Sequence, residues 1–465
     1  MDLRRFSNGI ARCGALCGVL AATLLVACPA RANPYEMKLD NGLRVIVKED
    51  HRAPVAMHMV WYRVGAMDET DGTTGVAHLL EHLMFKGTKT LKAGEFNKIV
   101  AGVGGSDNAF TSHDYTAYFQ RVPAVALPRM IRLEADRMRN LLIDKDEFER
   151  ELKVVMEERR LRTDDQPQAQ VYEQLMATTF NAHPYRRPVI GWMNDLENLR
   201  PADARAWYHR WYAPNNAYVV VVGDVDHRQV FELVKKAYGG MKAEPLPVRK
   251  ITAEPPQTGV RRVVVKAPAE LPQLLMAWKV PHLKDVEHDR EPYALEVLAG
   301  ILDGHAASRL PRNVVRGSQI ATEVGANYDS TSRGEATFML GGTPAKGKSV
   351  AELETALRAE VRRIADEGVS AEELERIKTL TVASQIYKRD STYVQAMEIG
   401  RLEAAGYRWQ DEDLMLDKVR SVTAEEVQSV ARKYFGDDTL NVAVLDPQPV
   451  DPNAKPRPRP AGLRH

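Results

Sequence analysis

The sequence predicts an α+β protein made of two homologous halves, each a mainly antiparallel sheet packed with helices. A helix–turn–strand pattern occurs twice, at residues 200–222 (RPADARAWYHRWYAPNNAYVVVV) and 423–445 (TAEEVQSVARKYFGDDTLNVAVL), with a constant offset of 223 positions and no gap. Each half also opens with an alternating apolar segment, at residues 43–47 and 262–265, as in a half-buried strand. This repeat predicts two units built alike, each with strands in one layer and helices in the other.

Composition divides the chain at two places. We expect a first half at residues 33–240 and its homologue at residues 259–446. Between them, residues 241–258 (MKAEPLPVRKITAEPPQT) contain four prolines and no sustained periodicity, which indicates a linker. The Pro-rich, apolar-poor residues 447–465 are predicted to be a disordered tail.

The first 32 residues have the pattern of a signal peptide. Arg4, Arg5 and Arg12 form a basic region, residues 13–28 are mostly apolar, and Ala30-Arg31-Ala32 offers small residues at a cleavage site. The apolar stretch is short for a membrane span, which needs about 20 residues. We therefore expect export to the periplasm and a mature chain without a transmembrane helix.

An alternative reading of this segment is lipidation. Leu25-Val26-Ala27-Cys28 resembles a bacterial lipoprotein box, in which Cys28 would carry the lipid anchor. All three cysteines lie before residue 33, so the mature chain has neither disulfides nor thiolate metal ligands.

The charge of the chain excludes one class of partner. The 64 Lys and Arg residues almost balance the 63 Asp and Glu residues. Nucleic-acid binding usually shows as a basic patch or a high pI, so no nucleic-acid partner is expected.

A metal motif stands on a predicted helix at residues 75–85. This segment is apolar on almost every side, which indicates a buried helix. His78 and His82 are one turn apart on the same face, so their imidazoles can take adjacent corners of a zinc tetrahedron. Glu81 projects beside them, close enough to act on a metal-bound water.

The alternative for each histidine is a hydrogen-bonded place in the core. Two histidines with a glutamate between them, on an apolar helix, fit that alternative poorly, because burying three ionisable groups costs several kcal/mol without compensation. The order His-x-x-Glu-His is itself a metallopeptidase motif.

The third ligand is expected on a helix at residues 148–161. Glu151 and Glu158 lie on the same side of it as the apolar residues, whereas Glu157 points about 100° away. We predict Glu158 as the third zinc ligand and Glu151 as a group that orients a histidine or the water. In the alternative, the two glutamates pair with the adjacent arginines Arg150, Arg159 and Arg160.

Several motifs together resemble the pitrilysin/insulinase metallopeptidases, in the bacterial two-repeat branch similar to mitochondrial processing peptidase. HLLEHLMFKGT (78–88) is similar to the family signature, and Glu158 follows His82 by the family's spacing of 76. GGSDNAFTSHDYTAYFQRVP (104–123) looks like the family's substrate strand, with its pair Asn108 and Ala109. FNAHPYRRPVIG (180–191) and WYAPNNAYVVVVGDVD (211–226) match in pattern as well.

The resemblance implies a function. It implies a zinc endopeptidase with one Zn²⁺ per chain, in which His78, His82 and Glu158 hold the metal. Residues 33–240 are then the zinc-bearing peptidase half, and residues 259–446 are the homologous half without a metal motif. Glu81 and Glu151 are the expected catalytic residues, with Glu81 as the base. The two halves would face each other across a chamber, and short or unfolded peptides would pair with the strand that carries Asn108.

One departure from the family pattern concerns the second half. Active relatives use an Arg and a Tyr there to hold the substrate carbonyl. Arg316 fits the arginine, but Glu323 stands at the tyrosine's place, and Tyr328 is five positions away. A carboxylate would repel a developing oxyanion. We therefore expect a partner subunit, in a homodimer or a heterodimer with a paralogue that lacks zinc, to supply this pair.

Two other functions remain open at this point. A non-catalytic subunit could keep the zinc for structure, although it would have no need of a base such as Glu81. An unrelated zinc hydrolase on another fold would show no internal repeat.

Overall fold

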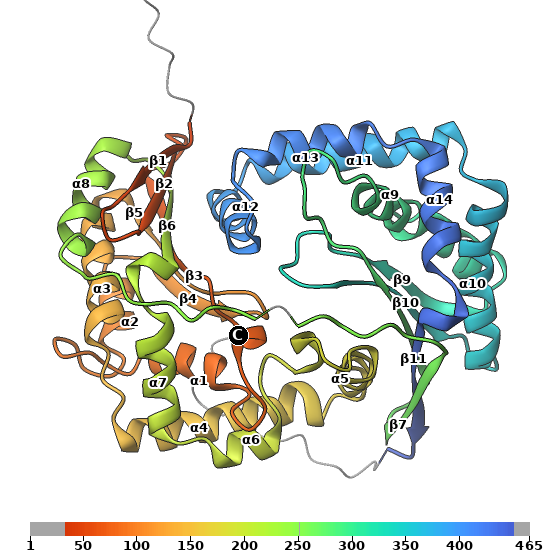
Figure 1. Cartoon of the computed structure of the whole chain (residues 1–465), viewed down its shortest axis with the longest axis horizontal. Coiled ribbons are helices and arrows are strands. Elements are labelled where there is room, and N and C mark those ends of the chain that lie inside the picture. The colour runs from red at the N-terminus through yellow and green to blue at the C-terminus, as the bar shows by residue number, and fades with distance from the viewer. Residues whose placement is uncertain (1–32, 251, 451–465) are drawn as a thin grey trace, which may run out of the picture.

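The computed structural model describes residues 33–250 and 252–450 (Figure 1). The predicted signal peptide, with its alternative lipidation at Cys28, and residues 451–465 of the predicted tail lie outside the described residues. We use the predicted division at residues 241–258 to name a first and a second half.

The first half contains strands and helices in mixed order. Its strands are β1 (Tyr35–Lys38), β2 (Arg44–Glu49), β3 (Val55–Tyr62), β4 (Ser106–Thr111), β5 (Thr116–Pro123) and β6 (Ala217–Gly223). Its helices are α1 (Val76–Leu83), α2 (Glu95–Gly102), α3 (Leu127–Asn140), α4 (Lys145–Arg159), α5 (Pro167–Thr179), α6 (Met193–Asn198), α7 (Pro201–Trp211) and α8 (His227–Tyr238). One π-helical turn, η3 (Arg160–Asp164), follows α4 directly.

The second half has the same kinds of element. Its strands are β7 (Arg261–Pro268), β8 (Gln273–Val280), β9 (Ala321–Asn327), β10 (Ala336–Pro344) and β11 (Leu440–Gln448). Its helices are α9 (Glu291–Asp303), α10 (Val350–Glu367), α11 (Ala371–Lys388), α12 (Thr392–Ala405), α13 (Asp411–Arg420) and α14 (Ala424–Tyr434). The irregular turn η6 (Pro311–Gly317) lies between α9 and β9.

Within the described residues the strands form two sheets of matching topology. The first has the order β1-β2-β6-β3-β5-β4 and the second β7-β11-β8-β10-β9. All pairs are antiparallel except β2–β6 and β7–β11, which are parallel. The predicted repeat is visible in the elements: α7 and β6 start at residues 201 and 217, and α14 and β11 start 223 positions later, at 424 and 440. The predicted α+β fold of two similar halves is confirmed.

Helices of its own half cover one face of each sheet. In the first half this core is the largest apolar cluster, with Val45, Val60, Leu80, Tyr118 and Val219 among its fully buried residues. Burial of this kind stabilises a fold by about 25 cal/mol for each Å² of apolar surface. Helix α1, whose residues are all buried, lies inside this core.

The opposite face of each sheet is covered by a helix from the other half. Helix α5 packs its Val171 and Leu175 on the second sheet, and α12 packs its Ala396 and Ile399 on the first (Figure 1). At Gly400 the α12 backbone approaches the first sheet so closely that an added Cβ would lie 2.1 Å from the Trp61 ring. The two halves are therefore joined by an exchange of helices.

Two segments outside the predicted halves, the start of the tail and the linker, are more ordered than their composition predicts. Strand β11 continues to Gln448, two residues into the predicted tail, because β7 offers a parallel partner as far as Pro268. The described residues of the linker form no helix or strand, yet its Glu254 carboxylate accepts hydrogen bonds from the backbone N–H groups of residues 181–183. These bonds hold the linker against the first half.

Among the helices of residues 33–250 and 252–450, none has both the length and the apolar character required to cross a membrane.

Candidate metal centre and active site

Helix α1 positions the central motif. It begins at Gly75, whose φ of 86° is left-handed and favours glycine. The buried Glu69 carboxylate accepts hydrogen bonds from the backbone N–H groups of Gly75 (2.9 Å) and Ala77 (2.8 Å), which caps the positive end of the helix. The first turn of α1, which carries His78, is thereby fixed.

Three side chains meet between α1 and α4. The Nε2 atoms of His78 and His82 lie 3.9 Å and 3.3 Å from Glu158 Oε2, and one ligand atom from each residue falls within 4.8 Å of the others. All three side chains are almost fully buried, with exposures of 8%, 2% and 1%. The structure thus brings together the three residues that the sequence predicts as ligands.

The donor set suits zinc. Within the described residues, the buried His82 Nε2 and Glu158 Oε2 atoms have no hydrogen-bond partner, a costly arrangement unless a cation joins them. Two imidazole nitrogens and one carboxylate oxygen are ligands that catalytic zinc takes, with a fourth position left open. These residues therefore fit a zinc ion.

The electrostatics of the cluster also favour a cation. Burial alone would raise the pKa of Glu158, but His82, His78 and Arg162 outweigh it and lower this pKa to about 2. The guanidinium of Arg162, one turn further along the helix, lies 2.9 Å from Glu158 Oε1. Oε2, which faces the two histidines, is the oxygen left to bind a metal.

The pairing alternative, in which neighbouring arginines neutralise the glutamates, holds only in part: Glu158 pairs with an arginine and Glu151 pairs with Lys86. The three arginines named for it have other partners: Arg150 pairs with Glu147, Arg159 with Glu173, and Arg160 with Glu157. Glu158 does have an arginine partner, Arg162, which the sequence analysis overlooked although its spacing of four from Glu158 is an ordinary helix signal.

Glu151 lies behind His82. Its Oε2 accepts a hydrogen bond of 3.3 Å from His82 Nδ1, and its Oε1 lies 2.6 Å from Lys86 Nζ. Burial raises its pKa, but His82 and Lys86 lower it below the ordinary value, so the carboxylate is ionised. A carboxylate in this place fixes the ring so that Nε2 points at Glu158.

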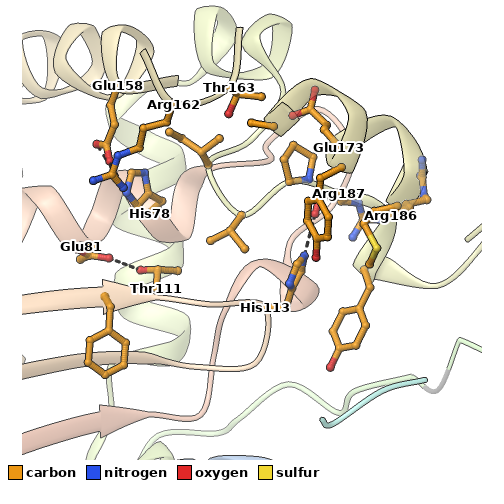
Figure 2. A pocket seen from close by; sticks show the side chains of 18 residues that line it. His78, Glu81, Thr111, His113, Glu158, Arg162, Thr163, Glu173, Arg186 and Arg187 are labelled. Atoms are coloured by element: carbon orange, nitrogen blue, oxygen red, sulfur yellow. Dashed lines mark hydrogen bonds and ion pairs between the residues drawn. The ribbon is translucent and has the colours of Figure 1, made fainter. Parts of the chain in front are cut away.

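Glu81 is held by a neighbouring strand. The Thr111 hydroxyl, at the end of β4, donates a hydrogen bond of 2.6 Å to Glu81 Oε2 (Figure 2). The Glu81 side chain is buried, and it is not one of the three residues of the ligand cluster. Thr111 is a site residue that the sequence analysis missed, because the contact joins segments 30 positions apart.

A pocket of about 500 Å³ opens beside this centre. Figure 2 shows His78, Glu81 and Glu158 at one end and His113, Arg186 and Arg187 toward the other. The apolar part of its lining consists of Phe110, Ala169, Tyr172, Met176, Tyr185, Pro188, Val189 and Ile190. Every lining residue in the described part of the chain comes from the first half.

His113 has a structural role in this pocket. Its Nε2 donates a hydrogen bond of 2.9 Å to the Arg187 carbonyl, and burial lowers the pKa of the ring. His113 is therefore neutral, and it connects the turn after β4 to Arg187 on the opposite side of the pocket.

The predicted substrate residues lie on an edge strand. Asn108 and Ala109 belong to β4, the last strand of the first sheet, and face Phe119 and Tyr118 of β5. The other side of β4 pairs with no described strand. A peptide could therefore be added to the sheet beside the metal centre.

The structure does not bring the second-half candidates to the pocket. Arg316 is exposed, and its guanidinium donates to the Ala306 carbonyl at 2.5 Å. Glu323 is exposed on β9, and the Tyr328 hydroxyl donates to the Pro281 carbonyl at 2.6 Å. None of these side chains lines the pocket of the first half.

A second group of possible metal ligands, Glu49, Asp226 and His227, lies at the start of α8. Glu49 Oε1 accepts hydrogen bonds from the backbone N–H and Nδ1 of His227, and Asp226 accepts one from the Gln229 backbone. These are helix-capping contacts, so the group has its partners without a metal.

Comparisons with known proteins decide the family. Residues 44–192 match the family model described as insulinase (peptidase family M16), and residues 198–381 match the peptidase M16 inactive domain. The zinc protease PqqE of Helicobacter pylori is 34% identical over 420 residues, which cover 88% of this chain and 92% of that protein. This chain belongs to the M16 peptidase family. The predicted resemblance to the two-repeat pitrilysin/insulinase metallopeptidases is confirmed.

Solved structures agree with the M16 assignment. The crystal structure of a protease from Helicobacter pylori has a TM-score of 0.84 and 31% identity, covering 89% of this chain and all of that one. The first half of the periplasmic protease PqqL from Escherichia coli, at 20% identity and a TM-score of 0.75, covers 89% of this chain and 92% of that chain and shares the fold. The names of the M16 relatives support a zinc peptidase in general.

Proposed function

We propose that this M16 chain is a zinc-dependent endopeptidase that hydrolyses short or unfolded peptides, with His78, His82 and Glu158 holding one zinc ion. The observation that carries the proposal is the meeting of these three buried side chains, whose ligand atoms lie within 4.8 Å of one another. The zinc-protease names of the relatives support the same reaction class.

Zinc held there would supply a Lewis acid for the scissile carbonyl and would acidify a water molecule. Glu81 accepts the proton of that water and later donates it to the leaving amine. The Thr111 hydroxyl, 2.6 Å from Glu81 Oε2, orients the carboxylate for both transfers. Glu151 acts through His82, by fixing its ring.

The substrate is proposed to bind as an extended strand. The open edge of β4 at Asn108 and Ala109 supplies backbone hydrogen bonds that do not depend on sequence. The adjoining pocket, about 500 Å³ and partly apolar, accommodates a side chain next to the scissile bond. Strand addition needs an extended backbone with free N–H and C=O groups, which short or unfolded peptides offer along their whole length.

A partner subunit is proposed to complete the site. Oxyanion stabilisation needs donors beside the developing charge, and Arg316, Glu323 and Tyr328 are directed elsewhere in this chain. A second copy of the chain or a paralogue without zinc would supply the missing arginine and tyrosine.

Export to the periplasm is part of the proposal. It rests on the signal-peptide pattern of residues 1–32 and on the similarity in fold to PqqL, which is described as periplasmic. The pattern at Cys28 leaves a lipid anchor as the other outcome of processing.

The second candidate function is a non-catalytic subunit that keeps its zinc. The presence of Glu81, held in place by Thr111 next to the ligands, favours the enzyme, because a structural zinc site needs no base.

Peptide hydrolysis by the purified chain tests the proposal. We expect a quenched fluorescent peptide of unfolded sequence to be cleaved by the zinc-loaded chain with its co-expressed paralogue, and cleavage to stop on chelation and return with zinc. Zinc content should be close to one ion per chain. A chain that binds zinc yet cleaves no peptide under either condition would favour the non-catalytic subunit, and robust cleavage by the chain alone would contradict the need for a different partner.

A further inference from the structure

The second half contains a cavity built like the zinc pocket of the first. It measures about 400 Å³ and is enclosed by α9, α11, α12, α13 and the loop after β9. Its place in the repeat can be fixed residue by residue, from the helices and from the strands.

The helices α4 and α11 give the first correspondence. Each begins after a capping side chain, Asp144 in α4 and Ser370 in α11. Seven positions after the cap stands Glu151 in α4 and Ile377 in α11. These two residues therefore occupy equivalent places in the two halves.

The contacts of Glu151 and Ile377 extend the correspondence to helices α1 and α9. Glu151 touches His82 of α1, and a Cβ added to Gly300 of α9 would lie 2.6 Å from Ile377. Gly300 thus occupies the place of His82. Four residues before Gly300, on the same face of α9, Glu296 occupies the place that His78 has on α1.

The strands give an independent correspondence. Ala217 of β6 pairs with Tyr62 of β3, and Leu440 of β11, 223 positions later, pairs with Trp278 of β8. Tyr62 faces Thr116 of β5 and Trp278 faces Phe338 of β10, so three residues further along Phe119 corresponds to Gly341. Their partners on the edge strands, Asn108 of β4 and Gly325 of β9, are therefore equivalent.

A hydroxyl beyond each of these positions holds a carboxylate of the neighbouring helix. Thr111, three residues beyond Asn108, donates a hydrogen bond to Glu81 on α1, and Ser330, five residues beyond Gly325, donates one to Glu296 on α9. Each half therefore has a helix carboxylate that accepts a hydrogen bond from a hydroxyl near its edge strand, beside a cavity, although Glu296 stands at the place of His78 and not of Glu81. The second half has lost the metal ligands, since glycine replaces one histidine, and no three-ligand group is found there among the described residues.

The basic groups that line this cavity are already paired. Lys388 Nζ lies 3.2 Å from Glu398, and an Arg401 nitrogen lies 3.1 Å from Asp329. These two pairs leave the cavity with no unpaired cation from the described part of the chain.

Two further carboxylates line the cavity. Glu296 and Glu412 form no ion pair with any residue of the described ranges. Burial raises the pKa of Glu296 to about 7, because the smaller, opposite effect of the Ser330 hydrogen bond does not offset it. A negative charge at Glu296 is therefore costly without a cation beside it. A cationic ligand would remove that cost.

The rest of the lining is mixed. Its apolar part consists of Leu283, Tyr293, Leu402, Met415, Leu416 and Val419, and its uncharged polar part includes Asn327, Thr331, Thr381 and Gln385. A carboxylate beside an apolar wall fits an ammonium group that carries a short hydrocarbon chain.

We propose that this cavity is a binding site for a primary ammonium group joined to a short apolar chain, with Glu296 as its counterion. Either a small amine or the amino terminus of a peptide offers that chemistry. The proposal is independent of the proposed peptidase function, because it needs neither zinc nor Glu81.

Calorimetric titration of the full-length chain with isoamylammonium tests the site. We expect saturable binding by the zinc-loaded and the chelated protein alike, and none of isoamyl alcohol, which has the same shape without the charge. Glu296→Gln should weaken binding by about tenfold or more, as expected when a charge-assisted hydrogen bond is lost. Glu372→Gln, an exposed carboxylate on α11, is the matched control and should bind like the natural chain.

The outcomes separate cleanly. Equal binding of the alcohol, unchanged binding by Glu296→Gln, or no saturable binding by the natural chain would overturn the proposal. If circular dichroism shows that Glu296→Gln is unfolded, Ser330→Ala and Glu412→Gln replace it, and both must weaken binding. A leucine-initiated peptide that binds only when its amino group is free identifies a peptide terminus as the source, and binding of the small amine alone identifies a metabolite.

Discussion

Replacing Glu81 with glutamine is expected to lower kcat for peptide hydrolysis by about a hundredfold to ten-thousandfold, the usual contribution of a general base. The amide keeps the shape of the side chain and can still contact Thr111, but it cannot accept a proton from water. Zinc content should not change, because Glu81 is not in the cluster of His78, His82 and Glu158. Fluorescent-peptide kinetics and atomic emission measure the two quantities on the same sample.

Thr111→Val is the matched control for this prediction. It removes the hydrogen bond to Glu81 but keeps the carboxylate, so we expect a smaller loss of kcat than for Glu81→Gln. Full activity of Glu81→Gln would show that another group is the base. Loss of zinc from that variant would instead make Glu81 a ligand.

Replacing Arg137 with methionine is expected to destabilise the first half by about 3–5 kcal/mol, because it leaves the Glu134 carboxylate buried without its cation. The Arg137 side chain is 1% exposed, and its Nε donates to Glu134 at 2.6 Å. Its guanidinium also lies 4.4–4.7 Å from the ring centroids of Phe85, Phe96 and Tyr118. Urea unfolding followed by fluorescence measures the loss.

Arg139→Met supplies the control on the same helix. Arg139 is exposed, and its loss should change the free energy of unfolding by no more than about 0.5 kcal/mol. Equal stabilities of the two variants would show that the buried pair contributes nothing beyond its hydrophobic contacts. Because Phe85 follows α1 directly, Arg137→Met should also reduce peptidase activity.

Local patterns made much of the fold predictable. The strand and helix at each end of the repeat follow from alternation and helical periodicity, which depend on neighbours within a few residues. The exchange of α5 and α12 between the halves could not be seen in this way. Which sheet a helix covers depends on contacts between residues more than 80 positions apart, such as Val171 with Val265.

The metal residues were predictable because helix phase limits the choices. On α4, Glu158 faces the core and Glu157 faces its partner Arg160 at the surface, as their positions on the helix indicate. The contacts of Thr111 with Glu81, and of Lys86 with Glu151, join different elements and have no sequence spacing of their own. The second cavity has no sequence signal either, because its lining comes from four helices and a loop that only the fold brings together.

The central claim is that His78, His82 and Glu158 hold a catalytic zinc ion, and anomalous diffraction at the zinc edge tests it most directly. For zinc-loaded crystals we expect one strong peak per chain, at about 2.0–2.2 Å from an imidazole nitrogen of each histidine and an oxygen of Glu158. A peak at Glu49, Asp226 and His227 instead, or no peak between α1 and α4, would contradict the account.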